Sequence, residues 1–298
     1  MLARSNWMGC LVVALVPLLS AQIARAADEG KGDKGDKGDE DEEEQSSKPD
    51  ADQPKYTAGA LWTRTTYSSN EVERPLNLTG GMVEGRLDFL FDLSKGVAFK
   101  TFTLGLAGRY GVTDTLEVDA GTNLTLTAPD MGQKPKSIFV AVQQSILHDL
   151  LAARLEVQLP VDPDFLFDVA LGFPIKFRLV PDKIAIEALE EIIVIHFAKP
   201  SGADSTPKPD INIAVGGVFQ ILDNLAVRVR GQVRINLDDT SRTAIPVEVD
   251  LQYTPINLID FGLFGRLDNL NPQATVEGAD KPSPIDARSL GLFIRGRY

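Results

Sequence analysis

The chain has 298 residues, with 30 Lys and Arg against 42 Asp and Glu, and a formal net charge of −12. So acidic a chain lacks the basic field that nucleic acid or an anionic surface requires, which excludes both as partners. Its one cysteine, Cys10, lies in an N-terminal apolar run. Disulfides, thiol catalysis and cysteine-based metal sites are therefore excluded beyond that run, and we expect neither a cofactor nor a metal centre.

Residues 1–26 have the pattern of a secretory signal peptide. Arg4 precedes an apolar run over residues 10–19, and Ala24-Arg25-Ala26 forms an Ala-x-Ala cleavage site. The alternative, a membrane anchor, is disfavoured because the run is too short to span a bilayer comfortably. No later stretch has 18 uninterrupted apolar residues. The sequence therefore predicts export without a helical anchor.

Two segments separate the signal peptide from the regular part of the chain. Residues 28–55 hold twelve acidic and five basic residues with almost no apolar content, so we expect residues 27–55 to be a disordered acidic segment. A solvated spacer is favoured there, with weak calcium binding or a partner-binding tail as the alternatives. Residues 56–82 are mixed in character, and form either an extra strand or an ordered lead-in.

From Val83 onward the pattern becomes strict alternation in a repeated hairpin. Tight turns recur within residues 110–118, 144–157, 178–186, 219–227 and 253–261, at spacings of 33 to 41 residues. Longer polar connections lie between them, over residues 128–136, 161–164, 198–209, 238–242 and 270–287. This predicts an all-β fold, a transmembrane antiparallel up-and-down β-barrel over residues 83–298. We count twelve strands, with ten or fourteen left open.

The alternate faces of the expected strands differ sharply. Odd positions from 165 to 177 are all large apolar residues, whereas Asp168, Lys176 and Arg178 lie on the opposite face. Residues 183–197 fit this pattern only with a bulge near residues 189–191, because the isoleucines change from even to odd positions. An amphipathic helix is the alternative for that segment, and we favour the bulged strand.

The last ten residues alternate in the same way and end on an aromatic residue. Leu290, Leu292, Ile294 and Tyr298 share one face. With residues 110–118 (Tyr-Gly-Val-Thr-Asp-Thr-Leu-Glu-Val) and Arg74-Pro75-Leu76, this ending resembles bacterial outer-membrane β-barrels of the broad porin and transporter-like group. The resemblance implies a Gram-negative outer membrane, contact with lipid, an N-terminal segment in the periplasm, and recognition by the barrel assembly machinery through the strand ending at Tyr298.

The expected inner faces carry twelve acidic and eleven basic side chains, so the lumen has mixed charge. We expect Arg109 to lie opposite Glu117, and Arg230 opposite Asp250. Cross-strand ion pairs that hold the interior together are the favoured interpretation. The functional alternative is a selectivity band for a charged or zwitterionic solute, formed by Arg228, Arg230, Arg234, Glu248 and Asp250.

These patterns leave two functions open for an outer-membrane barrel, and a secreted soluble β-protein is a third possibility. The first is a channel or facilitator for small solutes. The second is a non-conducting structural or interaction barrel with a salt-bridged lumen, whose acidic tail binds a partner. We do not expect an enzyme, because neither His148 nor His196 lies near a serine motif that would supply a nucleophile.

Overall fold

A computed structural model describes residues 66–96, 98–127, 135–147, 149–160, 167–197, 208–240, 243–272 and 283–298. The predicted signal peptide and acidic segment, and His148, lie outside these residues. Over the described ranges no helix is long and apolar enough to cross a bilayer. The strands are β1 Val83–Asp92, β2 Phe102–Gly111, β3 Leu116–Thr127, β4 Pro135–Leu147, β5 Leu151–Pro160, β6 Phe167–Gly172, β7 Ile175–Val180, β8 Ile184–Ala188, β9 Ile193–Phe197, β10 Lys208–Leu222, β11 Leu225–Asn236, β12 Val247–Ile256, β13 Ile259–Leu267 and β14 Arg288–Arg297.

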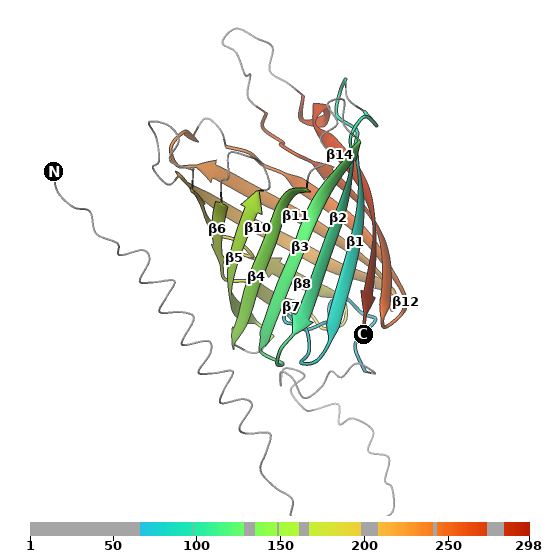
Figure 1. Ribbon diagram of the computed structural model, residues 1–298. Helices are drawn as coiled ribbons and strands as arrows, with labels where there is room; N and C mark the ends of the chain where they lie inside the picture. The colour runs from blue at the N-terminus through green and yellow to red at the C-terminus, as the bar shows by residue number, and fades with distance from the viewer. Residues whose placement is uncertain are drawn as a thin grey trace, which may run out of the picture. The chain divides into compact units, whose positions relative to one another are not determined.

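The strands form one antiparallel sheet that closes on itself (Figure 1). The first strand pairs with the last, with Phe89 opposite Leu292. The backbones of Val83 and Tyr298 exchange two hydrogen bonds of 2.8 Å. β6 and β7 are two pieces of one crossing, and β8 and β9 are two pieces of the next, since β10 pairs with both of the latter. The fourteen segments thus make a closed barrel of twelve crossings, as predicted.

The bulge expected near residues 189–191 is present. Leu189 has a φ of 61°, a left-handed conformation that interrupts the strand between β8 and β9. Residues 184–188 and 193–197 are strands rather than a helix. Because the bulge resets the alternation, the side chains of two consecutive glutamates, Glu190 and Glu191, both line a lumen cavity. A regular strand would have turned one of them toward lipid.

The continuous strand expected over residues 165–177 is wrong in one respect. The chain breaks between β6 and β7 at Phe173 and Pro174, beside the bulge. Proline has no N–H to donate to the ladder, and Phe173 N donates instead to Leu189 O at 2.9 Å. Gly172 is needed at this contact, since a Cβ there would lie 1.8 Å from the carbonyl oxygen of Glu190. The alternation of apolar and polar residues could not reveal the break, because odd-numbered side chains face outward both before and after it.

The outer face of the barrel is apolar and the inner face is charged. Phe177, Leu251 and Leu292 are 51%, 43% and 49% exposed, while Asp260 and Arg295 on the inner face are 0% and 7% exposed. A water-soluble barrel buries its apolar face, so this arrangement requires a non-aqueous surrounding. The C-terminal strand follows the predicted faces, with Leu290, Leu292 and Ile294 outward.

The connections differ at the two ends of the barrel. At one end the links are short, at residues 112–115, 148–150, 181–183, 223–224 and 257–258, and Tyr298 ends the chain there (Figure 1). At the other end they are longer, at residues 93–101, 128–134, 161–166, 198–207, 237–246 and 268–287. The predicted alternation of tight turns and long connections is confirmed.

Residues 66–82 form no strand and lie inside the barrel at its short-turn end. We call residues 66–82 the inward segment. Val72 packs with Ala185 of β8 and Val218 of β10, and all three are fully buried. Tyr67, Leu78 and Met82 form a second buried cluster. The described part of this segment contributes no strand to the barrel.

Candidate functional site

The predicted band lies on the inner faces of β11 and β12. Arg228 pairs with Asp250 across the two strands, and Arg230 pairs with Glu248. The expected pairing of Arg230 with Asp250 is therefore wrong by two residues. β11 and β12 are joined by the long connection of residues 237–246, whose length does not determine the register.

The ion pair expected between Arg109 and Glu117 is present, although not in direct register. The backbone of Arg109 lies opposite Asp119, yet its guanidinium donates to Glu117 at 2.8 Å and to Glu84 at 3.1 Å. An arginine side chain is long enough to reach a diagonal neighbour on the same face. Ion pairs of this kind are the structural contacts expected of the lumen.

The band residues differ in how fully they are paired. Arg228 donates to Glu71 at 2.9 Å and lies 3.3 Å from Glu187. Arg230 lies 2.6 Å from Glu190 of the bulge. Asp250 is only 7% exposed, and its Oδ1 accepts no hydrogen bond from the residues that the structure describes. A buried polar atom without a partner is costly, and in the band both this oxygen of Asp250 and the Nε of Arg228 lack a hydrogen-bond partner among the described residues.

Three adjoining cavities lie in the lumen, and the one described first shares lining residues with each of the other two. The first, of about 240 Å³, is lined by Arg228, Arg230, Glu248 and Asp250. The second, of about 190 Å³, adds Arg234 and shares Arg230, Glu190 and Glu248 with the first. The third, of about 290 Å³, reaches the inward segment and shares Arg228, Glu187 and Arg86 with the first. The structure thus gathers all five predicted site residues around two adjoining cavities.

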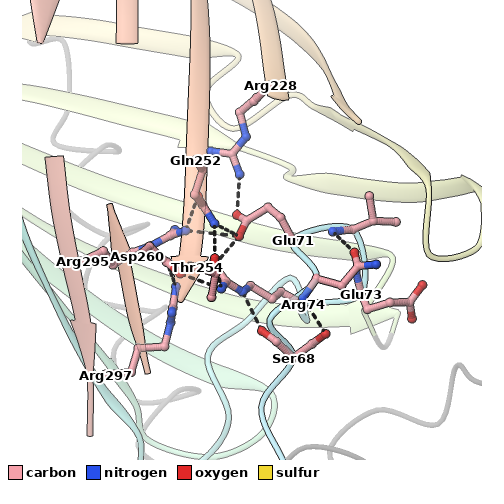
Figure 2. Close-up of polar contacts among 12 residues, drawn as sticks. Ser68, Glu71, Glu73, Arg74, Arg228, Gln252, Thr254, Asp260, Arg295 and Arg297 are labelled. Atoms are coloured by element: carbon pink, nitrogen blue, oxygen red, sulfur yellow. Dashed lines mark hydrogen bonds and ion pairs between the residues drawn. The ribbon is translucent and has the colours of Figure 1, made fainter. Parts of the chain in front are cut away.

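The inward segment places one carboxylate among donors from three strands of the wall (Figure 2). Glu71 accepts from Arg228 of β11 at 2.9 Å, from Gln252 of β12 at 2.8 Å and from Arg295 of β14 at 3.2 Å. Its carboxylate also pairs with Arg74 of the same segment. Glu71 is 5% exposed, so this set of donors surrounds it almost completely.

Asp260 of β13 is the centre of a second set of contacts beside the first. It accepts from Arg74 at 2.8 Å, and from Arg295 and Arg297 of β14 at 2.6 Å. The hydroxyl of Thr254 donates to it at 2.8 Å. Arg74 and Arg295 each bind both Glu71 and Asp260, so the two carboxylates belong to one network (Figure 2).

The wall also binds the backbone of the inward segment. Arg178 donates to the carbonyl oxygens of Val72, Glu73 and Arg74 at 3.0 to 3.1 Å. Lys176 donates to the carbonyl of Glu71 at 2.9 Å. These contacts do not depend on the side chains of the segment, so they set its path across the lumen.

The charge of Glu71 is fixed by its neighbours. Burial by itself would raise the pKa of this carboxyl, but the cationic groups of Arg74, Arg295, Arg228 and Lys176 lower it well below its ordinary value. Glu71 therefore stays ionised at neutral pH. In the same segment, burial raises the pKa of the Tyr67 phenol, which stays protonated.

His196 lies in β9 between two carboxylates. Its Nδ1 is 2.8 Å from Asp168 and its Nε2 is 3.1 Å from Asp210. Both ring nitrogens are thus occupied by carboxylates that link β6, β9 and β10, and neither faces a serine hydroxyl. Within the described residues, no group of three or more histidine, cysteine, aspartate or glutamate side chains is placed to hold a metal ion.

Sequence reasoning missed the most extensive polar contacts of the lumen. Glu71 and Arg74 lie before the first strand, so strand alternation gives no information about them. Glu190 and Glu191 follow the bulge, and only its backbone conformation turns both inward. The one sequence signal was Arg74-Pro75-Leu76, which marked the approach to the first strand but not its direction.

A closed antiparallel barrel with an apolar exterior and a charged lumen is the architecture of a transmembrane β-barrel of the bacterial outer-membrane kind. No family model matches the chain, and no curated protein matches it. Among solved structures, the NanC porin is similar at 11% identity with a TM-score of 0.49, covering 72% of this chain and 98% of that one. The KdgM porin follows at 6% identity and a TM-score of 0.48, with the same coverage.

Proposed function

We propose that this protein is a channel or facilitator that passes small charged or zwitterionic solutes across the outer membrane of a Gram-negative bacterium. The observation that carries the proposal is the pair of adjoining lumen cavities lined by charges of both signs, where Oδ1 of Asp250 accepts no hydrogen bond from the described residues. A solute with a donor group and an anionic group would find a partner for each.

The same proposal gives the barrel an orientation. In outer-membrane barrels the short turns face the periplasm and the long loops face outside. The short-turn end, with Tyr298 and the inward segment, would then face the periplasm, and the N-terminal residues before the segment would lie there too. Tyr298 would sit at the lipid interface, at the end of the strand that the assembly machinery recognises.

One observation favours the second candidate, a non-conducting barrel. The inward segment is bound by several wall arginines at the short-turn end. If that contact is permanent, the lumen is closed and its ion pairs are structural, and an acidic N-terminal tail would be free to bind a partner.

Conductance across a planar lipid bilayer separates the two candidates. We expect the purified full-length protein to give discrete current steps, and small charged solutes in the lumen to reduce the current of the open level transiently without lowering the open probability. Folding is checked first by migration on a detergent gel with and without boiling. A folded barrel that remains silent, both intact and after release of the inward segment by substitution at Glu71, would rule out the channel.

A further inference from the structure

The donors around Glu71 have the composition of a carboxylate-binding site. Two guanidinium groups and one amide, from Arg228, Arg295 and Gln252, converge on the two oxygens of a single carboxylate. Charge-assisted hydrogen bonds from arginine are the strong, geometrically specific means of recognising a carboxylate. All three donors belong to the barrel wall, while the carboxylate belongs to a segment outside the sheet.

The third cavity gives this site a route to the rest of the lumen. The 290 Å³ cavity is lined by Glu71, Arg228 and Arg295. It shares Arg86, Glu187 and Arg228 with the cavity that contains Asp250. A solute that has passed the predicted band would therefore meet Glu71 and its donors next.

We propose that Arg228, Gln252 and Arg295 form a binding site for a solute carboxylate, that Glu71 occupies this site in the closed state, and that the solute displaces Glu71 and releases the inward segment. The inference rests on the proposed channel function and adds to it a solute class and a mode of opening. Because Glu71 is tethered beside its donors, a free carboxylate must compete with a high effective concentration, so opening requires solute on the order of millimolar or above.

Propionate is a suitable probe, because it reproduces the side chain of glutamate, and propionamide is its neutral match. In bilayers containing the full-length protein, propionate is expected to raise the open probability about tenfold, and propionamide to leave it unchanged. Glu71→Gln removes the competing charge, so this variant is expected to be open without propionate and to lose the response to it.

Glu73→Gln is the matched control for that substitution. Glu73 lies on the same segment, but its carboxylate accepts only from the backbone N–H of Asp182, at 2.8 Å, among the contacts described. The control is expected to keep the closed state and the propionate response of the parent protein. An equal effect of the two substitutions would overturn the assignment of the site to Glu71.

A disulfide tests whether the segment itself is the obstruction. Val72 and Ala185 are buried in one cluster, and the chain has no cysteine after Cys10, so V72C with A185C introduces the only thiols beyond that residue. The oxidised protein is expected to stay closed with propionate present, and the reduced protein to respond. Gel migration of the oxidised and reduced forms confirms that both barrels are folded and that the bond forms.

The outcomes separate this inference from the channel itself. Current through the oxidised disulfide variant, or a Glu71→Gln variant that opens while the parent protein ignores propionate, would overturn the carboxylate site and leave the channel standing. Silence of every folded variant, including Glu71→Gln and the reduced disulfide variant, would overturn the channel.

Discussion

At the scale of single residues, the behaviour of the lumen depends on which opposite charge or hydrogen-bond donor each charged side chain contacts. Glu71 has three wall donors, Arg230 has Glu190, and Asp250 keeps an oxygen without a donor. A buried ion pair contributes little net stability, but removing one member leaves the other charge buried and costs about 3–5 kcal/mol. Substitution of one member of a buried ion pair in the lumen is thus expected to alter function or local structure more than the loss of one charge from the total would suggest.

The closed state should be insensitive to mild acid. The groups facing Glu71 are Arg74 on its own segment, and Lys176, Glu187, Arg228, Gln252 and Arg295 on the wall. The pKa of Glu71 is lowered in the folded state. The stability that its ionised carboxylate gives to the closed state is therefore complete above the unfolded pKa of about 4.3, and it is lost as the pH falls through the lower pKa of the folded state. Open probability is therefore expected to be constant from about pH 8 to pH 5. Opening with a midpoint near about pH 6 would contradict this assignment.

Arg230 should influence ion selectivity, because it lines two adjoining cavities. Arg230→Gln leaves Glu190 and Glu248 without this cation, so the reversal potential in a salt gradient is expected to shift toward cation selectivity. Arg288→Gln is the control, since Arg288 is exposed beside the connection of residues 268–287 and its guanidinium donates only to the backbone carbonyl of Ile285, at 2.9 Å, among the contacts described. An equal shift in both variants would indicate a general charge effect rather than a lumen site.

At the scale of elements, the two interrupted crossings distinguish this barrel from a uniform one. The break at Phe173 and Pro174 and the bulge at Leu189 lie side by side, joined by the hydrogen bond from Phe173 N to Leu189 O. Together they carry Glu190 and Glu191 into the lumen, so an irregularity of the wall creates part of the site. The bulge was predictable from the shift in alternation, whereas the adjoining break was not.

Gly172→Ala tests the packing of this irregularity. The added Cβ would lie 1.8 Å from the carbonyl oxygen of Glu190, so backbone must move, at a cost of about 1–3 kcal/mol. We expect the unboiled form on a detergent gel to be lost at a lower temperature. Gly231→Ala in β11 is the matched control, because its Cβ meets nothing within 4 Å. Equal thermal resistance in the two variants would mean that the bulge can shift freely.

At the scale of the whole molecule, closure between β1 and β14 leaves no free sheet edge, which is what permits strands to cross lipid. The full-length protein is expected to migrate differently on a detergent gel before and after boiling, because a closed barrel resists detergent. Removal of residues 289–298 deletes the partner of β1 and should abolish this difference. Identical migration of the intact protein under both conditions would argue against the lipid barrel.

The sequence by itself predicted the barrel, twelve strands as the favoured count with ten or fourteen left open, the two kinds of connection and the mixed charge of the lumen. These follow from two-residue alternation and local turns, which any short stretch of chain displays. Only the tertiary structure decided the register of β11 against β12, the turning of Glu190 and Glu191 into the lumen, and the path of the inward segment. Glu71 meets Arg228 across 157 residues and Arg295 across 224, and contacts so distant leave no periodic trace in the sequence.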